Sequence, residues 1–293
     1  MGRGCRRTPD KLLPGIDIEN LSLLHCCNGF LLFEHSCNIK TFEYVVCNPA
    51  TEQLVAVPRS PLQKNMDCDW FGNTNFLMFD PVVSLHFHLI QFWNSFQLSV
   101  AAVHIFSSET GVWSDRASEW KAGEEGGEWA RWGESSDILC VTDGTLFNNM
   151  LHFIVCPVNG SNGDDMIVAV DRKGETCRII PWRENFSYPH FVGQSQGQLF
   201  CLTVGVPQKS ELSIWVLEEY DTEEWSLKHR VSFLKLFGKV SCRENYDYAV
   251  VAIHPNCNLI FFFDRRCRKL ISYDMDSEEV HALCTLRVAG THK

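Results

Sequence analysis

The sequence lacks the features that would direct a chain into or across a membrane. No apolar run approaches the roughly 18 residues that a membrane-spanning helix needs. The longest candidates, Leu98–Phe106 and Leu259–Phe263, are short enough to be buried strands. The basic start, residues 1–11, has no apolar segment behind it of the kind that a signal peptide contains. We therefore expect no membrane partner and a location in the cytoplasm, the nucleus or both.

Metal-ligand and disulfide spacings are also missing. The chain has 14 cysteines but no C-x-x-C pair, whereas zinc sites and small disulfide frameworks show clustered, regular spacings. Most of these cysteines stand in apolar runs, where cysteine packs as a small hydrophobic residue. His86 and His88 would share one face of a strand over Val82–Phe92, but no third ligand stands near them. We predict reduced cysteines, no metal and no cofactor.

Enzyme and nucleic-acid signatures are scarce as well. The sequence has no G-x-x-x-x-G-K-[ST] loop and no H-E-x-x-H pair, and we expect no serine nucleophile elbow. A net charge of -10 disfavours nucleic acid, because phosphate binding needs a concentrated basic surface. We predict a protein that is not an enzyme, with no catalytic residues and no nucleic-acid partner.

The clearest pattern that is present is a hairpin over Glu211–Phe233. Apolar residues recur with a period of two in its first half and share one face in its second half: Leu212, Ile214, Val216, then Trp225, Leu227, Val231, Phe233. An acidic turn, Glu219–Glu224, separates the halves. Two alternating runs joined by a short turn predict an antiparallel β-hairpin.

This design recurs along the chain as units of two hairpins. The units cover residues 26–58, 82–115, 143–182, 193–233 and 248–286. About four strands in roughly 40–50 residues are typical of a propeller blade, and stacking such sheets in a ring buries both of their apolar faces. We predict an all-β propeller of five or six four-stranded blades. A sixth blade would come from Asp115–Leu139 or from the two termini together.

Two long irregular segments, Gln63–Asn75 and Asp115–Asp137, hold large aromatic residues. Long loops with aromatics on a rigid scaffold are candidates for partner binding; the candidates here are Trp70, Phe71, Trp120, Trp129 and Trp132. These side chains could instead cap the edges of blades. A third alternative is carbohydrate binding or carbohydrate-active chemistry, with Trp129 and Trp132 as stacking platforms beside Glu124, Glu125 and Glu128.

Several runs resemble, in order, the motifs of the plant F-box-associated domain family. CCNGFLLF with YVVCNPATEQLVAVP is similar to that family's C-N-G-L-L run and V-x-N-P-x-T turn, and DGTLFNNMLHFIV and MIVAVDRKGETCRIIP are similar to its next strands. LSIWVLEEYDTEEWSLKHRVSF resembles L-x-I-W-V-L-x-x-Y-x-x-x-x-W, and KLISYDMDSEEV resembles K-L-I-S-Y-D-L-x-T-x-E-V. The resemblance spans residues 26–286.

The resemblance implies a kelch-like β-propeller over residues 26–293 that receives the protein substrate of a cullin–RING ubiquitin ligase. Residues 1–25 carry little periodicity and are expected to be a poorly ordered lead-in. They also do not show the roughly 40-residue helical pattern of a complete F-box. An adaptor of the ligase is therefore expected as a partner only if an F-box exists outside this chain.

Overall fold

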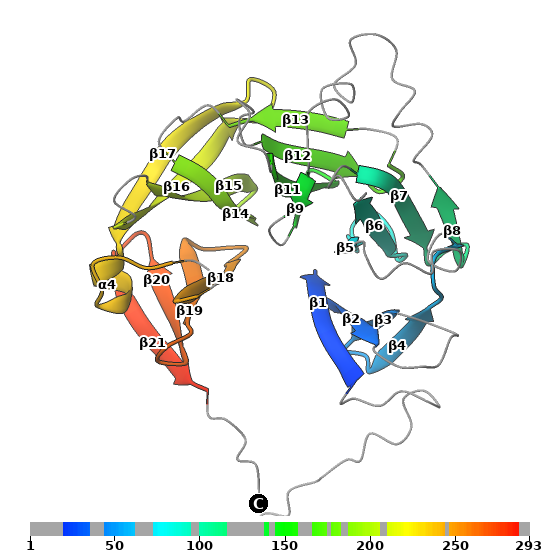
Figure 1. Cartoon of the computed structure of the whole chain (residues 1–293), viewed down its shortest axis with the longest axis horizontal. Coiled ribbons are helices and arrows are strands. Elements are labelled where there is room, and N and C mark those ends of the chain that lie inside the picture. The colour runs from blue at the N-terminus through cyan, green and yellow to red at the C-terminus, as the bar shows by residue number, and fades with distance from the viewer. Residues whose placement is uncertain are drawn as a thin grey trace, which may run out of the picture. The chain divides into compact units, whose positions relative to one another are not determined.

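The structure is a computed structural model, and it describes eleven stretches of the chain (Figure 1). These are residues 20–35, 44–61, 73–94, 100–115, 138–140, 144–157, 166–174, 177–182, 187–205, 210–243 and 246–286. The chain divides into two compact units, Met1–Phe96 with Val100–Trp120 (unit 1) and Gln97–Ser99 with Lys121–Lys293 (unit 2). Each unit is built from antiparallel sheets of consecutive strands.

Unit 1 contains two four-stranded sheets. Sheet A has the order β1-β2-β3-β4, with strands Leu21–Cys27, Phe30–His35, Tyr44–Asn48 and Gln53–Val57. Sheet B has the order β5-β6-β7-β8, with strands Asn73–Met78, His88–Asn94, Val100–Ser107 and Val112–Asp115.

Unit 2 contains three sheets. Sheet C has the order β10-β11-β12-β13, with strands Thr145–Phe147, Met150–Pro157, Met166–Asp171 and Cys177–Pro181, and β9 (Ile138–Cys140) also pairs with β11. Sheet D has the order β14-β15-β16-β17, with strands Ser187–Ser195, Gln198–Gly205, Glu211–Glu219 and Glu224–Ser232. Sheet E has the order β18-β19-β20-β21, with strands Tyr248–Ile253, Leu259–Asp264, Lys269–Asp274 and Val280–Thr285.

A short helix, α4 (Phe233–Phe237), follows sheet D. Ser232 caps its first turn by accepting a hydrogen bond from the Lys235 N–H, and Gly238 ends it in the left-handed conformation with φ 69°. Among the described stretches, no helix has the length and apolar character needed to cross a membrane.

Both faces of sheet D are covered by other sheets, and its strands are therefore more apolar than those of a sheet with one face in water. Along β15, Phe200 and Leu202 belong to a buried cluster shared with sheet E, whereas Leu199 and Cys201 belong to one shared with sheet C. On β16, Trp215 is also buried, at 9% exposure. A strand whose two faces are both covered reads as a continuous apolar run, so period-two alternation alone describes β16 only in part.

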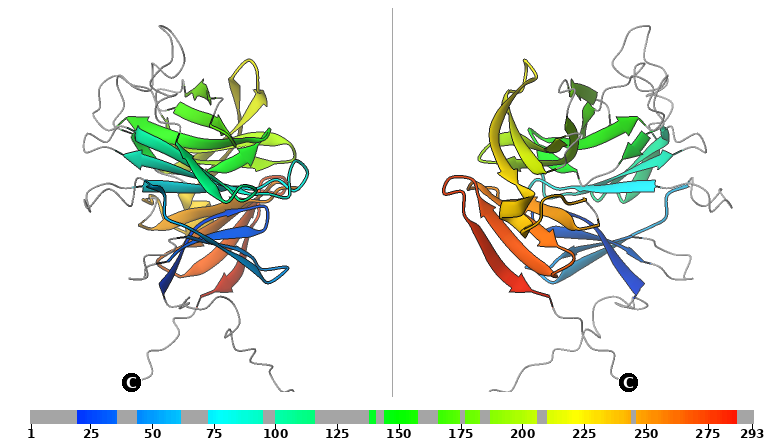
Figure 2. Two further views of the ribbon diagram at one scale, coloured as in Figure 1. Left: turned by 90° about the vertical axis from the view of Figure 1, so that its right-hand side faces the viewer. Right: turned by 60° about the vertical axis from the view of Figure 1, so that its left-hand side comes forward.

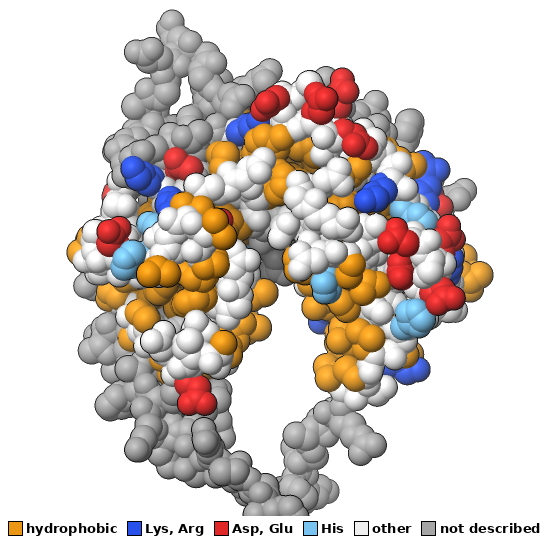
Figure 3. All heavy atoms as spheres, turned by 180° about the vertical axis from the view of Figure 1, so that it is seen from behind, with side chains coloured by type: hydrophobic (Ala, Val, Ile, Leu, Met, Phe, Trp, Pro, Cys, Tyr) orange, Lys and Arg blue, Asp and Glu red, His pale blue; other side chains and the backbone are white. Residues whose placement is uncertain are grey.

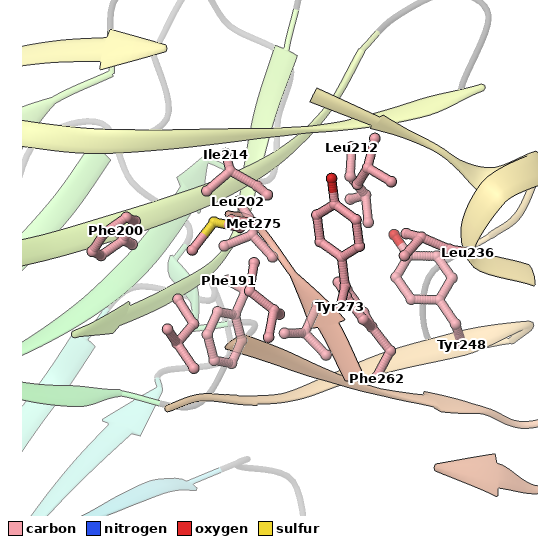
Figure 4. Packing of buried hydrophobic residues seen from close by; sticks show 14 of the residues in the cluster. Phe191, Phe200, Leu202, Leu212, Ile214, Leu236, Tyr248, Phe262, Tyr273 and Met275 are labelled. Atoms are coloured by element: carbon pink, nitrogen blue, oxygen red, sulfur yellow. The ribbon is translucent and has the colours of Figure 1, made fainter. Parts of the chain in front are cut away.

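The cluster between sheets D and E is rich in aromatic side chains (Figure 4). It contains Phe191, Phe200, Leu202, Leu212, Ile214, Leu236, Tyr248, Phe262, Tyr273 and Met275, all of them buried. Fully burying one such side chain contributes about 1.5–3 kcal/mol relative to leaving it in water. Burial of this cluster therefore holds these two sheets together.

Several strand boundaries differ from the sequence prediction. The first strand begins at Leu21, so the boundary expected at residue 26 falls inside β1. Strand β5 occupies Asn73–Met78, at the end of the segment expected to be an irregular loop. The strand expected over Val82–Phe92 is wrong in its first half, because β6 begins only at His88. In Asp115–Leu139 the described residues show the end of β8 and the start of β9, and no sixth sheet.

The order of strands places two kinds of connection at opposite ends of each sheet. The turns that join the first strand to the second and the third to the fourth lie at one end, which we call the turn end. The other connections lie at the opposite end. Figure 2 shows the hairpins of the sheets from two further directions. The turn end carries the site described next.

Candidate functional site

The five aromatic residues proposed from the sequence as a partner-binding surface lie outside the described residues. They are Trp70, Phe71, Trp120, Trp129 and Trp132. Their role stays a prediction, as does the carbohydrate alternative that uses Trp129 and Trp132. The candidate site is therefore built from side chains that the structure places.

Among the described residues of unit 1, the two most exposed large apolar side chains stand on the loop between β5 and β6, residues 79–87, which we call the β5–β6 loop. Val82 is 92% exposed, Leu85 is 84% exposed and Val83 is 49% exposed. Isolated surface aliphatics are common, but three on one short loop form a patch. Polar residues Ser84 and His86 interrupt and flank this patch.

Backbone hydrogen bonds hold the β5–β6 loop in place. The Asp80 carboxylate accepts from the Val82 N–H at 2.9 Å, and the Asp80 carbonyl accepts from Val83 at 3.1 Å and Ser84 at 2.9 Å. Farther along, the Ser84 hydroxyl accepts from the His86 N–H at 3.1 Å. An Asx turn of this kind fixes a short loop without help from packed side chains. The valines and the leucine are therefore not needed to shape it.

The first hairpin of sheet A holds the start of the loop through hydrogen bonds. Asn28 donates from its side-chain amide to the Phe79 carbonyl at 2.7 Å, and the Cys27 thiol donates to the same carbonyl at 3.3 Å. Burial raises the pKa of the Cys27 thiol to about 11, so it stays protonated and able to donate at neutral pH. Asn28 and Gly29 have φ of 45° and 84°, which matches the turn predicted from the Asn-Gly pair.

Aromatic packing anchors the other side of the loop. Phe87 is 4% exposed, and its ring centroid lies 6.3 Å from that of Phe30 and 6.2 Å from that of Phe106. Phe87 and Ser108 also exchange hydrogen bonds, from Phe87 N–H to the Ser108 hydroxyl at 2.9 Å and from Ser108 N–H to the Phe87 carbonyl at 3.0 Å. The loop thus joins the β7–β8 turn, after which Val112 is 59% exposed. Figure 3 shows the molecule from behind, with several groups of exposed hydrophobic side chains among polar and charged ones.

Unit 2 presents a polar contact between its sheets C and D instead. His152, which is fully buried, lies 3.0 Å by Nδ1 from the Met150 carbonyl and 2.8 Å by Nε2 from the Tyr220 hydroxyl. A carbonyl only accepts, so Nδ1 carries the proton and Nε2 accepts from Tyr220. Burial lowers the pKa of His152 to about 4, which keeps the ring neutral and unable to titrate near pH 7.

Arg178 completes this contact. Its guanidinium carbon lies 4.3 Å from the centre of the Tyr220 ring, and it pairs with Asp221 and Glu223 at 3.5 Å each. Burial raises the pKa of Tyr220, so the phenol stays protonated. Every polar group here already has a protein partner, and the contact therefore locks the β16–β17 turn onto sheet C.

One motif was missed from the sequence. Gly193–Gly197 matches G-x-S-x-G, which in α/β-hydrolases exposes a nucleophilic serine between a strand and a helix. Here the run forms the end of β14 and the tight turn into the antiparallel strand β15, and Ser195 is fully buried. Its hydroxyl donates to the His254 carbonyl at 2.8 Å, and the Cys257 carbonyl lies 3.3 Å away. A buried serine bonded to main-chain carbonyls has no base to activate it, so it is a structural link between sheets D and E.

Glycine at position 193 has a packing explanation as well. A Cβ there would lie 2.9 Å from the Phe191 ring and 3.0 Å from Ile253 of β18. The close approach of sheet D to sheet E requires the missing side chain. The pattern therefore reflects sheet packing and not a catalytic elbow.

Metal ligands do not assemble in the part of the chain that the structure describes. No group of three His, Cys, Asp or Glu side chains comes together there. His86 is in the β5–β6 loop whereas His88 starts β6, so the shared strand face expected for them does not exist. Eight described cysteines are free, and of these Cys26, Cys267 and Cys284 are exposed, so the expectation of buried cysteines is only partly met.

Sequence reasoning overlooked the β5–β6 loop because it extended a strand through it. The signal that could have found it is Asp80-Pro81, since Asp followed by Pro favours the start of a turn. The loop cannot be recognised as exposed from its sequence, because Val-Val-Ser-Leu is equally typical of a strand.

Comparison with protein families gives one match over nearly the whole chain. The model for the family described as F-box protein At3g26010-like, beta-propeller matches residues 12–287. The five antiparallel sheets of the structure are thus the blades of a five-bladed β-propeller, each with four strands in sequence order and sheet C with β9 as a fifth. No curated protein sequence matches the chain at a significant level.

Solved structures share the fold at low sequence identity. An oligogalacturonate lyase in complex with manganese aligns with a TM-score of 0.50 and 8% identity over 89% of this chain and 63% of the lyase. A prolyl endopeptidase aligns with a TM-score of 0.49 and 10% identity over 92% of this chain, which spans only 37% of the endopeptidase. The likeness to the lyase shows the fold alone.

Proposed function

The chain belongs to the F-box protein At3g26010-like β-propeller family, and from this premise we propose that it is a non-catalytic receptor for a protein partner. In this proposal the propeller is kelch-like, and it works inside the cell as the substrate-recognition part of a cullin–RING ubiquitin ligase. Its partner is the protein to be ubiquitinated. The chain performs no chemistry on that partner and supplies only a shaped surface.

The β5–β6 loop is the observation that carries this proposal. Val82 and Leu85 are more than four-fifths exposed, although they sit on a backbone that is fixed by hydrogen bonds which Asp80 and the Ser84 hydroxyl accept from main-chain N–H groups. Exposed apolar side chains on a pre-formed loop bind with little loss of conformational entropy. An apolar centre with a polar rim is the usual anatomy of a protein–protein contact.

The environment of Ser195 and the closed His152–Tyr220 contact support a binding role over a hydrolytic one. Ser195 donates to the His254 carbonyl, and His152 is fully buried against Tyr220, so neither side chain is open to a substrate. General acid–base catalysis needs a group within hydrogen-bond reach of substrate and with a pKa near the working pH. His152, with its pKa near 4, meets neither requirement.

To test this, the tagged, purified chain is added to a cell extract, recovered by its tag, and the proteins bound to it are measured by quantitative mass spectrometry. The test variant is Val82→Ser with Leu85→Ser. The control is Leu23→Ser with Val55→Ser, which removes two exposed aliphatics, 58% and 41% exposed, from sheet A of the same unit. We expect the partner's recovery to fall about tenfold or more in the test variant, because central apolar contacts carry most of an interface's energy.

Three results of this experiment decide the proposal. Loss of the partner in the test variant and its retention in the control supports the loop as the receptor surface. Equal recovery in both variants removes the loop from the interaction. Release of a small-molecule product from any recovered partner would overturn the non-catalytic assignment.

A further inference from the structure

Basic side chains gather at the end of sheet E opposite its turn end, on two segments that are distant in sequence. Residues 239–247 and 264–269 together carry six Lys or Arg and three Asp or Glu, in a chain whose net charge is -10. The exposed members are Arg243, Arg265, Arg266, Arg268 and Lys269. We call these five residues, with Tyr246, the basic corner.

A buried carboxylate fastens the two segments together. Asp247, of which 7% of the side chain is exposed, pairs with the Nε of Arg266, and it accepts a hydrogen bond from the Arg243 main-chain N–H at 2.8 Å. The Asp247 carbonyl accepts from the Arg265 N–H at 2.9 Å. Asp247 therefore fixes the backbone of both segments at the positions from which the arginine side chains extend.

A second buried carboxylate shapes the β19–β20 turn itself. Asp264 accepts hydrogen bonds from the main-chain N–H groups of Arg266 and Cys267, each at 3.0 Å, and lies 3.9 Å from the Lys239 ammonium. The Arg268 carbonyl in turn accepts from the Leu286 N–H at 2.8 Å. The backbone of the turn is therefore held on both sides.

The side chains of the basic corner differ in whether they pair with a carboxylate of the fold. Arg266 is committed to Asp247, although 62% of its side chain remains exposed. Arg265 and Arg268 are exposed, and neither pairs with a carboxylate in the stretches that the structure describes. The Arg243 guanidinium carbon lies 5.5 Å from the Tyr246 ring centre, and Tyr246 is 76% exposed. The fold thus presents two guanidinium groups that it does not neutralise, and the exposed Tyr246 precedes Asp247, whose carbonyl accepts from the Arg265 N–H.

We propose that the basic corner docks an acidic segment of a protein partner, with Arg265 and Arg268 binding Asp or Glu carboxylates and Tyr246 packing against a neighbouring apolar side chain. Guanidinium forks match carboxylates in a bidentate geometry. A local excess of positive charge on a negatively charged protein attracts an acidic segment to this place and repels it elsewhere. Extended nucleic acid is disfavoured as the occupant, because a chain with a net charge of -10 repels a long polyphosphate.

This inference stands apart from the proposed function, because it uses residues of unit 2 only and holds whether or not the β5–β6 loop binds a partner. The probes are fluorescein-labelled peptides of Asp, Glu and Leu, the same peptides with Asn and Gln in place of the acids, and a labelled single-stranded oligonucleotide. The whole chain is titrated against each probe and fluorescence anisotropy is measured at low and high salt.

The test variant is Arg265→Ala with Arg268→Ala, and the matched control is Arg172→Ala with Lys173→Ala, which removes the same charge from the β12–β13 turn of the same unit. We expect saturable binding of the acidic peptide, a Kd about tenfold higher in the test variant, and a Kd within about twofold of the original in the control, since each lost charge-assisted contact costs about 1 kcal/mol or more. Because neither test residue pairs within the fold, its melting temperature should equal that of the unaltered chain.

The proposal is overturned by any of three results. These are no saturable binding of the acidic peptide, equal binding of the Asn and Gln peptide, or equal weakening in both variants. Tighter binding of the oligonucleotide than of the acidic peptide would overturn it too, in favour of a nucleic-acid surface.

Discussion

The β5–β6 loop of unit 1 and the basic corner of unit 2 solve the same structural problem with opposite side-chain chemistry. In the loop, Asp80 fixes the backbone and leaves Val82 and Leu85 in water. In the corner, Asp247 and Asp264 fix the backbone and leave Arg265 and Arg268 in water. A buried or capping carboxylate holds the backbone in each case, so the exposed side chains are spared from stabilising the fold and are available for binding.

The difference between the two surfaces teaches what each can recognise. An apolar surface gains energy by removing area from water, and that gain depends little on salt. A surface of guanidinium groups gains energy from charge, and screening at physiological ionic strength already weakens it beyond about 8 Å. The following predictions test this contrast, beginning with the largest effect.

Removing the anchor beneath the loop should cost the most. Phe87→Ala leaves a cavity between Phe30 and Phe106, whose ring centres lie 6.3 Å and 6.2 Å from that of Phe87. Buried Phe→Ala changes lower the free energy of unfolding by about 3–5 kcal/mol. Urea unfolding followed by tryptophan fluorescence measures it. Phe87→Leu is the control, and a loss below about 1 kcal/mol in Phe87→Ala would show that packing does not anchor the loop.

Acid should weaken unit 2 through His152. With its pKa held near 4 instead of 6.5, the folded chain binds no proton on this ring while the unfolded chain does. The stability that the neutral ring provides is complete above pH 6.5 and falls by about 3 kcal/mol as the pH drops towards 4.

The variant His152→Gln isolates this effect. The amide can still donate to the Met150 carbonyl and accept from Tyr220, but it does not titrate. Between pH 6.5 and 5, the slope of the unfolding free energy against pH should be smaller in this variant, by the amount that corresponds to about one fewer proton taken up on unfolding. An unchanged slope would assign the acid sensitivity to other groups.

A smaller effect separates the two kinds of arginine in the basic corner. Arg266→Ala removes the partner of Asp247 and should lower the melting temperature, whereas Arg268→Ala should leave it unchanged. The main-chain N–H of Arg243 and the charges of Arg266 and Lys239 hold the pKa of Asp247 below its usual value of 3.8. The two variants should therefore differ in melting temperature when the pH is above 3.8. This difference is lost as the pH falls through the lowered pKa of Asp247 in the folded chain. Equal melting temperatures at neutral pH would contradict the role of Asp247 as a fastener.

The smallest expected change is in the stability of the variant with Val82→Ser and Leu85→Ser. Surface substitutions that touch no packed group stay within about 0.5 kcal/mol, and these side chains are 92% and 84% exposed. Urea unfolding should give the midpoint of the unaltered chain. A loss above about 1 kcal/mol would mean that the loop's apolar groups serve the fold.

Much of the strand pattern was predictable, because it depends on neighbours in the sequence. The acidic turn Glu219–Glu224 lies between β16 and β17 as predicted, and Asn28-Gly29 forms the expected turn. The misses, β5 and the first half of Val82–Phe92, occur where a strand and an exposed loop share the same residue types. Short apolar runs do not distinguish the two.

The candidate sites were less predictable than the fold. The aromatic residues singled out from the sequence lie outside the described residues, and the two surfaces that the structure presents were not foreseen. The G-x-S-x-G run shows the reverse case, a familiar pattern whose serine turns out to bond the His254 carbonyl. A motif specifies chemistry only in its structural context.

By itself, the sequence determined the hairpins, because period-two apolar patterning and turn residues act within a few positions of one another. Only the tertiary structure decided which apolar and charged side chains stay in water. That choice depends on bonds between distant segments, such as Asn28 to Phe79 and Arg266 to Asp247. The exposure of a side chain depends on which distant residues pack beside it, and a local sequence pattern does not contain that information.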